Sequence, residues 1–232
     1  MSLNDICDFV EDVHILTSEK GSLFAGPNST LPLNGLYFFF ETGQKIAARS
    51  KEYSRIVRIG INEKLNNFPK RIRGHYRGNI EGSVFRENIG WALLDANGKR
   101  PLQNYRTKSN YRKQNSGGPL ERDISDYFSK ALTFKAFKFD YHKLASYEET
   151  LIAAFSFYYQ YKLFKKELNL GDWLGLYSYS RQDRIKRSGL WNSEGVVLVD
   201  SCSSLETAKV VHEGVSNSIL KNIMVDLSSN IL

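Results

Sequence analysis

The segment Gly35-Leu36-Tyr37-Phe38-Phe39-Phe40 is dense in aromatic residues, and Ile56-Val57-Arg58-Ile59-Gly60 follows it as a second apolar run. Aromatic and β-branched residues favour strands, so we expect two strands, at about 36–41 and 54–60. A polar segment containing Thr42-Gly43-Gln44 separates them. The pair is predicted to form a hairpin, although with a connection longer than most hairpins have.

Helices and one further strand are predicted around this hairpin. In chain order, the pattern indicates a helix at 4–17, a loop at 21–34, helices at 69–76, 83–94 and 121–131, a strand at 134–139, a long helix at 146–168, an irregular segment at 171–195 and one or two closing helices within 202–227. This order favours an α+β fold in which a small three-stranded antiparallel sheet is flanked by helices, with helical additions at both ends. No repeat or boundary divides residues 1–232, so we expect a single domain.

The composition is that of a globular protein with a basic bias. The 232 residues carry a net charge of +7 and a pI near 9.3, which favours an anionic partner such as nucleic acid. No apolar run is long enough for a membrane span, and the acidic N-terminus is unlike a signal peptide. Cys7 and Cys202 lie far apart without metal-type spacing, which fits a reducing cytoplasm.

Glu148 has an unusual position in the long helix. Leu151, Ile152, Phe155 and Tyr159 follow at helical spacing, so Glu148 shares their apolar stripe whereas Glu149 points to water. A carboxylate that faces a core needs a cation, a metal or hydrogen bonds. Two interpretations fit: a ligand for a divalent ion such as Mg²⁺, or a partly hydrated residue that the helix dipole stabilises near the helix start.

Three further side chains offer phosphate chemistry. Arg71 and His75 are four residues apart and would share one helix face, and an arginine fork can bind a phosphate through two hydrogen bonds. A hydrated basic helix face is the alternative interpretation. Tyr37 could serve the same chemistry, but a tyrosine on an apolar strand is more often a core residue.

The segment 97–116 contains no acidic residue and interleaves tyrosines with cations. Cations attract phosphates and tyrosines stack on bases, so we expect a DNA-binding loop rather than a passive hydrated insertion. Other cations, including Arg55, Lys70, Arg73 and Arg77, extend this basic character. The predicted DNA-binding residues of the loop are Lys99, Arg100, Tyr105, Arg106, Lys108, Tyr111, Arg112 and Lys113.

Five short motifs in order resemble the GIY-YIG nuclease family, and in particular a bacterial subgroup of it. They are Gly35-Leu36-Tyr37 for the first element, Arg58-Ile59-Gly60 for the second, Arg71-Ile72-Arg73-Gly74-His75 for the arginine helix, Glu148-Glu149-Thr150-Leu151-Ile152 for the glutamate helix and Ser188-Gly189-Leu190-Trp191-Asn192 for the terminal asparagine region. The resemblance covers residues 35–195 as a nuclease core, with 97–116 as a basic insertion loop.

This resemblance implies a metal-dependent endonuclease that hydrolyses DNA, with double-stranded DNA as the expected partner and one Mg²⁺ or Mn²⁺ as cofactor. By the same resemblance, Tyr37 would position or activate the attacking water and Arg71 would stabilise the transition state. Glu148 would hold the metal, and His75, Arg58 and Asn192 would complete the catalytic site. A restriction or host-defence role is the expected setting.

The chain departs from the family pattern at Arg58, which occupies the place of the second tyrosine. Arg58 could contact a phosphate instead, or the water could be activated in another way. The alternative function is therefore a catalytically inactive DNA-binding protein with the same fold. A third interpretation is a protein-interaction domain whose basic loop binds an acidic partner. The oligomeric state has no signature in the sequence.

Overall fold

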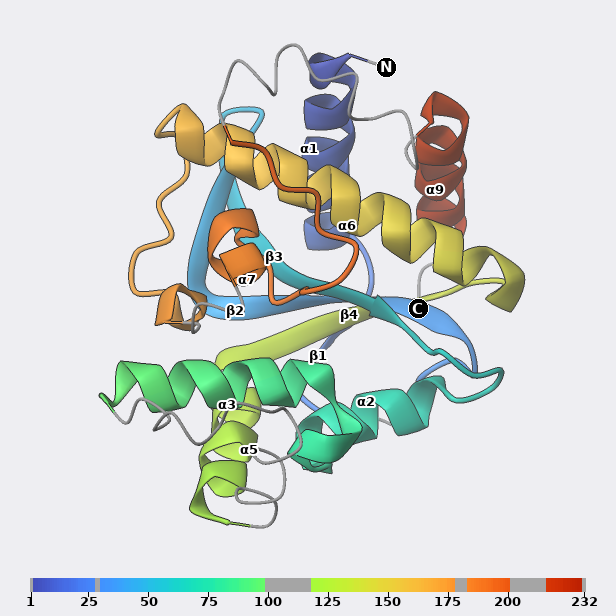
Figure 1. Cartoon of the computed structure of the whole chain (residues 1–232). Coiled ribbons are helices and arrows are strands. Elements are labelled where there is room, and N and C mark those ends of the chain that lie inside the picture. The colour runs from blue at the N-terminus through green and yellow to red at the C-terminus, as the bar shows by residue number, and fades with distance from the viewer. Residues whose placement is uncertain (1, 28–29, 99–117, 178–182, 201–215, 231–232) are drawn as a thin grey trace.

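A computed structural model describes residues 2–27, 30–98, 118–177, 183–200 and 216–230. Its centre is a four-stranded antiparallel sheet in the order β1-β4-β2-β3 (Figure 1). The strands are β1 (Leu23–Phe24), β2 (Gly35–Ala48), β3 (Lys51–Ile61) and β4 (Leu132–Lys138). The predicted α+β fold is confirmed, and the two-residue β1 adds an edge strand to the three that were expected.

Two groups of helices cover the sheet. In Figure 1, α1 (Leu3–Glu19), α6 (Tyr141–Phe164) and α9 (Asn217–Ser229) lie on one side, and α2 (Phe68–Arg77), α3 (Val84–Ala96) and α5 (Pro119–Ala131) lie on the other. Two short 3-10 helices, η1 (Ile80–Gly82) and η2 (Leu174–Tyr177), and the short helix α7 (Asp183–Ser188) complete the described elements. None of the described helices combines the length and apolarity that crossing a lipid bilayer requires.

The aromatic run of β2 is continuous because both of its faces are buried. Phe38 points to α6, where its ring centroid lies 6.4 Å from that of Phe155. Phe39 points the other way, with its ring centroid 5.2 Å from that of Phe85 on α3. Successive strand residues face opposite sides of a sheet, so a strand covered on both sides reads as an uninterrupted apolar segment.

The β2–β3 hairpin differs from the predicted one in length. Both strands continue past the predicted ends, and only Arg49 and Ser50 connect them. Both residues have positive φ, 44° and 65°, as a tight type I′ turn requires. The polar Thr42–Gln44 segment, expected as part of a long connection, instead forms an irregularity within β2, where the register shifts between Phe40 and Lys45.

The other helices and the strand predicted before residue 171 are present with small changes of boundary. The segment 171–195, expected to be irregular, contains η2 and α7. In the predicted closing region 202–227, α9 is present from Asn217, whereas 202–215 lie outside the described residues.

The helix expected at 146–168 begins earlier, at Tyr141, because Asp140 caps it by accepting a hydrogen bond from the backbone N–H of His142. Ser83 caps α3 in the same way. Asn67 precedes α2 but makes no side-chain capping bond.

Candidate active site

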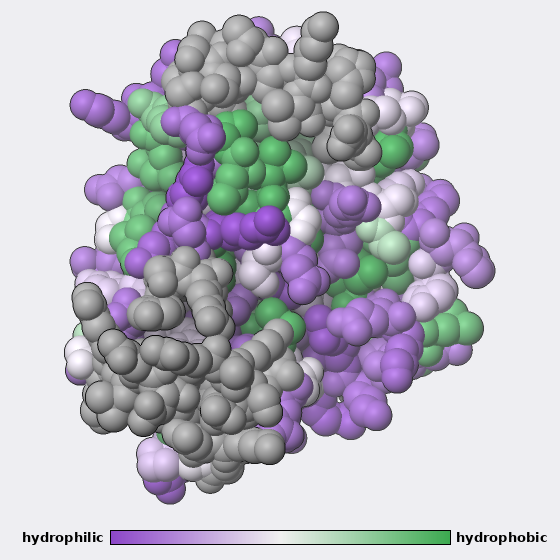
Figure 2. All heavy atoms as spheres, in the orientation of Figure 1, coloured by the Kyte–Doolittle hydropathy of each residue, from purple (hydrophilic) through white to green (hydrophobic). Residues whose placement is uncertain are grey.

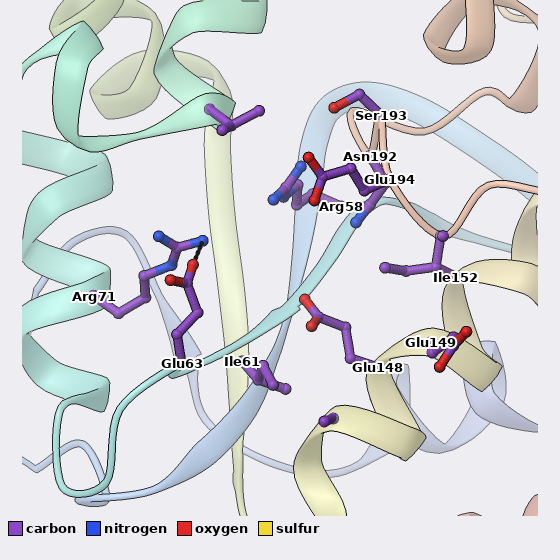
Figure 3. A pocket seen from close by; sticks show the side chains of 13 residues that line it. Arg58, Ile61, Glu63, Arg71, Glu148, Glu149, Ile152, Asn192, Ser193 and Glu194 are labelled. Carbon is purple, nitrogen blue, oxygen red and sulfur yellow. Dashed lines mark ion pairs between the residues drawn. The ribbon is translucent and has the colours of Figure 1, made fainter.

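Four of the predicted site residues line one cavity of about 400 Å³ (Figure 3). Arg58 comes from β3, Arg71 from α2, Glu148 from α6 and Asn192 from the loop that follows α7. Apolar side chains form part of the wall, and Glu63, Glu149 and Glu194 add carboxylates at its surface. The cavity therefore joins two cations to several anions, as a site for a phosphate together with a metal ion requires.

Arg71 extends from the flank of α2 into this cavity. Its Nη2 lies 3.0 Å from Oε1 of Glu63, and the Glu63 side chain is 69 % exposed against 22 % for Arg71. The Nε of Arg71 is buried and has no hydrogen-bond partner. Burial alone would lower the pKa of Arg71, but the neighbouring Tyr37, Glu63 and Glu148 raise it. The guanidinium is thus a permanent cation whose only ion-pair partner among the described residues is a solvent-exposed carboxylate.

Glu148 enters the same cavity from the first third of α6. Leu151, Ile152, Phe155 and Tyr159 are all buried, as the helical phase predicted, and Glu148 is partly buried beside them while Glu149 is exposed. Burial raises the pKa of the Glu148 carboxyl, whereas the positive charges of Arg58 and Arg71 oppose that rise. The carboxylate therefore depends on these two arginines for its ionised form.

Tyr37 and His75 lie behind the cavity wall rather than on it. Both are fully buried, and the Tyr37 hydroxyl lies 2.9 Å from His75 Nε2. His75 Nδ1 lies 2.9 Å from Ser83 Oγ. The Tyr37 ring rests on Gly60, where any side chain would collide with it, because a Cβ there would lie 2.1 Å from the hydroxyl. The glycine of the Arg58-Ile59-Gly60 motif thus makes room for the tyrosine of the first motif.

His75 is held in its neutral form. Burial lowers its pKa well below the ordinary value, and the charges of Arg71, Arg58 and Arg86 lower it further. A neutral imidazole donates through one ring nitrogen and accepts through the other, so both of its contacts are satisfied. We refer to Tyr37, His75 and Ser83 as the closed half of the site, and to Arg58, Arg71 and Glu148 as the open half.

Arg58 is fixed by contacts on two sides. Its Nη1 donates to the backbone carbonyl of Trp191 at 2.8 Å, and its guanidinium carbon lies 5.0 Å from the ring centroid of Phe85. Its Nε is buried without a partner. In place of a second phenol, the site therefore holds a second, rigidly oriented guanidinium.

Asn192 binds the backbone of β3 rather than another site residue. Its side-chain amide accepts from the Ile59 N–H at 3.1 Å and donates to the Ile59 carbonyl at 2.9 Å. The N–H of the preceding Trp191 donates to the Val57 carbonyl at 2.7 Å. These bonds attach the loop to the strand next to Arg58, so Asn192 supports the cavity wall.

A buried network that the sequence did not suggest anchors the same loop. The carboxylate of Glu41 accepts hydrogen bonds from Trp173 and Trp191 at 3.0 and 3.1 Å and a short one from Tyr127. Arg55, expected among the DNA-facing cations, is instead fully buried. It donates to the Gly189 carbonyl and to the Gln44 side chain. The only sequence signal was a carboxylate directly after an apolar run.

The predicted DNA-binding residues Lys99, Arg100, Tyr105, Arg106, Lys108, Tyr111, Arg112 and Lys113 all lie outside the described residues. Their role stays a prediction.

The open half could hold a divalent metal only if water and substrate phosphates supplied most of its ligands. The described residues contain no group of three or more histidine, cysteine or acidic side chains that could hold a metal by themselves. Mg²⁺ is commonly held by one or two carboxylates, with water and substrate phosphates as the remaining ligands. Glu148 offers such a carboxylate in the same cavity as Arg58 and Arg71.

Comparison with known families agrees with this geometry. A family model described as a GIY-YIG domain matches residues 3–216, which is most of the chain. Comparison with curated proteins and with solved structures gives no match. Because the match spans well over half of the sequence, the chain belongs to the GIY-YIG domain family, whose members are generally endonucleases that act on DNA and typically depend on a divalent metal.

Proposed function

We propose that this protein is a metal-dependent endonuclease of the restriction or host-defence type that hydrolyses phosphodiester bonds in double-stranded DNA. The observation that carries the proposal is the convergence of Arg58, Arg71 and Glu148 on one cavity in a chain of this family. Residues 35–195 form the nuclease core of a single domain, and the basic segment 97–116 adds contacts to DNA.

The two arginines bind the scissile phosphate. Arg71 offers its fork in place of the contact with Glu63, which is exposed and free to rotate away. Arg58 is pre-oriented by Trp191 and Phe85, so it loses little side-chain entropy when it binds an anion. Fixed positive charges stabilise the negative charge that grows on the phosphate in the transition state.

Glu148 would hold the single Mg²⁺ or Mn²⁺ ion. When bound, that ion would supply Lewis-acid polarisation of the phosphate. Burial raises the pKa of the Glu148 carboxyl, and the charges of Arg58 and Arg71 oppose that rise and so favour its ionised form. The arginines thus serve both the anionic substrate and the anionic ligand.

Tyr37 positions the attacking water through its hydroxyl, and neutral His75 fixes the direction of that hydroxyl. Tyr37 is fully buried in the free protein and lies next to Arg71. Its hydroxyl therefore reaches the water only when Arg71 turns toward a bound phosphate. Asn192 keeps the β3 side of the cavity in place.

The buried position of Tyr37 also supports a second candidate, a catalytically inactive DNA-binding protein. In that case Arg58 and Arg71 would bind phosphate, but no phenol would reach a water molecule. This candidate predicts DNA binding that weakens with salt and no cleavage at any metal concentration.

Cleavage of plasmid and linear duplex DNA with Mg²⁺ or Mn²⁺ separates the two candidates. The endonuclease proposal predicts metal-dependent nicks or breaks with the unmodified protein and none with Glu148→Gln. Salt-sensitive binding without cleavage would assign the inactive function instead. Equal residual cleavage by both proteins would indicate a contaminating nuclease and count against the proposal.

A further inference from the structure

The outer face of α2 carries three exposed cations and no acidic residue. Lys70, Arg73 and Arg77 are all exposed, while Phe68, Ile72, His75 and Tyr76 form the buried side of the helix. Among the described residues, no acidic side chain forms an ion pair with any of the three cations. Predominantly hydrophilic residues cover this part of the surface (Figure 2). The three side chains form a continuous positive ridge.

Gly74 lies in this face, and nothing in the described part of the chain explains why this position is a glycine. A glycine in a helix interior lowers stability relative to alanine. A Cβ at Gly74 would meet no atom of the described residues within 4 Å, and the φ of Gly74 is not among the positive ones. Neither packing nor backbone conformation therefore requires glycine here. A bare backbone is useful where a ligand must approach closely.

Around the helix, Gly74 lies between the ridge and Arg71, which lines the cavity. At about 100° per residue around the helix, Gly74 lies about 60° from Arg71 and about 40° from Lys70. A chain of phosphates that passes from the ridge to Arg71 thus crosses the helix at Gly74. From Lys70 to Arg77 the ridge extends about 10 Å. One strand of a duplex advances about 3.4 Å along the axis for each phosphate, so a ridge of this length can contact more than one phosphate.

We infer that the outer face of α2, formed by Lys70, Arg73, Gly74 and Arg77, binds the sugar–phosphate backbone of duplex DNA and guides the strand into the cavity at Arg71. This inference rests on the proposed function, because it names where the substrate of that site lies. The cations give affinity without sequence preference, and Gly74 allows the backbone to lie close against the helix.

The test is DNA binding without cleavage, measured by fluorescence anisotropy with a labelled duplex in EDTA over a range of salt concentrations. Arg73→Ala should reduce the slope of log affinity against log salt by about 1. Lys221→Ala, which removes one exposed cation from α9, is the matched control and should leave the slope unchanged.

Gly74→Ala gives the sharper result because it should move stability and binding in opposite directions. The substitution favours the helix, so the Tm should rise by about 2–4 °C, yet duplex binding should weaken several-fold because the new methyl group faces the DNA backbone. Gly26→Ala, at a surface loop position where a Cβ also meets nothing, should not weaken binding.

Two results would overturn the inference while leaving the proposed function intact: normal duplex binding by Gly74→Ala, or equal salt slopes for Arg73→Ala and Lys221→Ala. Displacement of the duplex by polyglutamate at an equal concentration of charge would assign the ridge to an acidic protein and would also overturn the inference. Absence of duplex binding by the unmodified protein at low salt would instead contradict the proposed function itself.

Discussion

The two halves of the candidate site differ in how completely their polar groups are satisfied. In the closed half, the Tyr37 hydroxyl, both nitrogens of His75 and the Ser83 hydroxyl are paired with one another. In the open half, Arg58 and Arg71 each keep a buried Nε without a partner, and Glu148 has a raised pKa. Buried polar groups are normally satisfied in folded proteins. Arg55 and Arg86 also keep a buried Nε without a partner, but of these four arginines only Arg58 and Arg71 line the cavity, where a ligand could meet them.

The two halves should also contribute differently to stability and to activity. Groups in the closed half satisfy one another and fix geometry, whereas groups in the open half keep unpaired polar atoms or a raised pKa and are the ones that we propose to bind the substrate and the metal. Substitutions in the two halves should therefore affect stability and activity in different proportions.

The largest effect on activity is expected for Arg71→Ala in the open half. Loss of one transition-state donor should reduce kcat for DNA cleavage by about 10²–10³-fold. The free energy of unfolding should change by only about 1 kcal/mol, because the one ion-pair partner of Arg71 among the described residues, Glu63, is largely exposed. Single-turnover cleavage and urea unfolding measure the two quantities. Normal cleavage by Arg71→Ala, or failure of this variant to fold, would contradict the claim that the open half affects activity more than stability.

Tyr37→Phe in the closed half should have a larger effect on stability and a smaller effect on cleavage than Arg71→Ala. It leaves the buried Nε2 of His75 unpaired, which should lower the free energy of unfolding by about 1–3 kcal/mol. Loss of the hydroxyl that positions the water should slow cleavage by about tenfold, which corresponds to one hydrogen bond. Tyr177→Phe, at a tyrosine that is 45 % exposed, is the control. Unchanged stability of Tyr37→Phe would show that the closed half is not a structural unit.

Arg58→Gln should move the pH dependence of cleavage and leave the fold intact. Glu148 must be ionised to hold the metal, so activity is present above the pKa of its carboxyl and is lost as the pH falls through it. Arg58 lowers that pKa, and its removal should raise the pKa and shift the acid limb of kcat/KM to higher pH. Arg122→Gln, at an exposed arginine of α5, should keep the acid limb of the unmodified protein. An acid limb of Arg58→Gln at the original pH would contradict electrostatic coupling within the open half.

The sequence was sufficient to predict most elements and the inward phase of Glu148, because both depend on local periodicity. The hairpin turn was missed because Arg49-Ser50 lacks the glycine or asparagine that usually marks such turns. The polar Thr42–Gln44 segment resembled a connection, although it lies inside β2.

The supporting contacts of the site were beyond sequence reasoning because they depend on tertiary packing that no local pattern reveals. Glu41 binds the indole of Trp191, 150 residues later, and the strand alone does not reveal which face meets that loop. Glu63 follows β3 without any periodic signal, and only the approach of α2 brings it to Arg71. Arg55 has the charge of a DNA contact but lies in the interior.

Comparison of the unmodified protein with Glu148→Gln in DNA cleavage, with and without Mg²⁺ or Mn²⁺, tests the central claim most directly. Thermal unfolding of both proteins should accompany it. Because burial raises the pKa of Glu148, its ionised form costs stability at neutral pH, and the glutamine variant should have an equal or higher Tm. The account predicts metal-dependent cleavage by the unmodified protein and none by this stable variant. Cleavage by Glu148→Gln at the rate of the unmodified protein would contradict it.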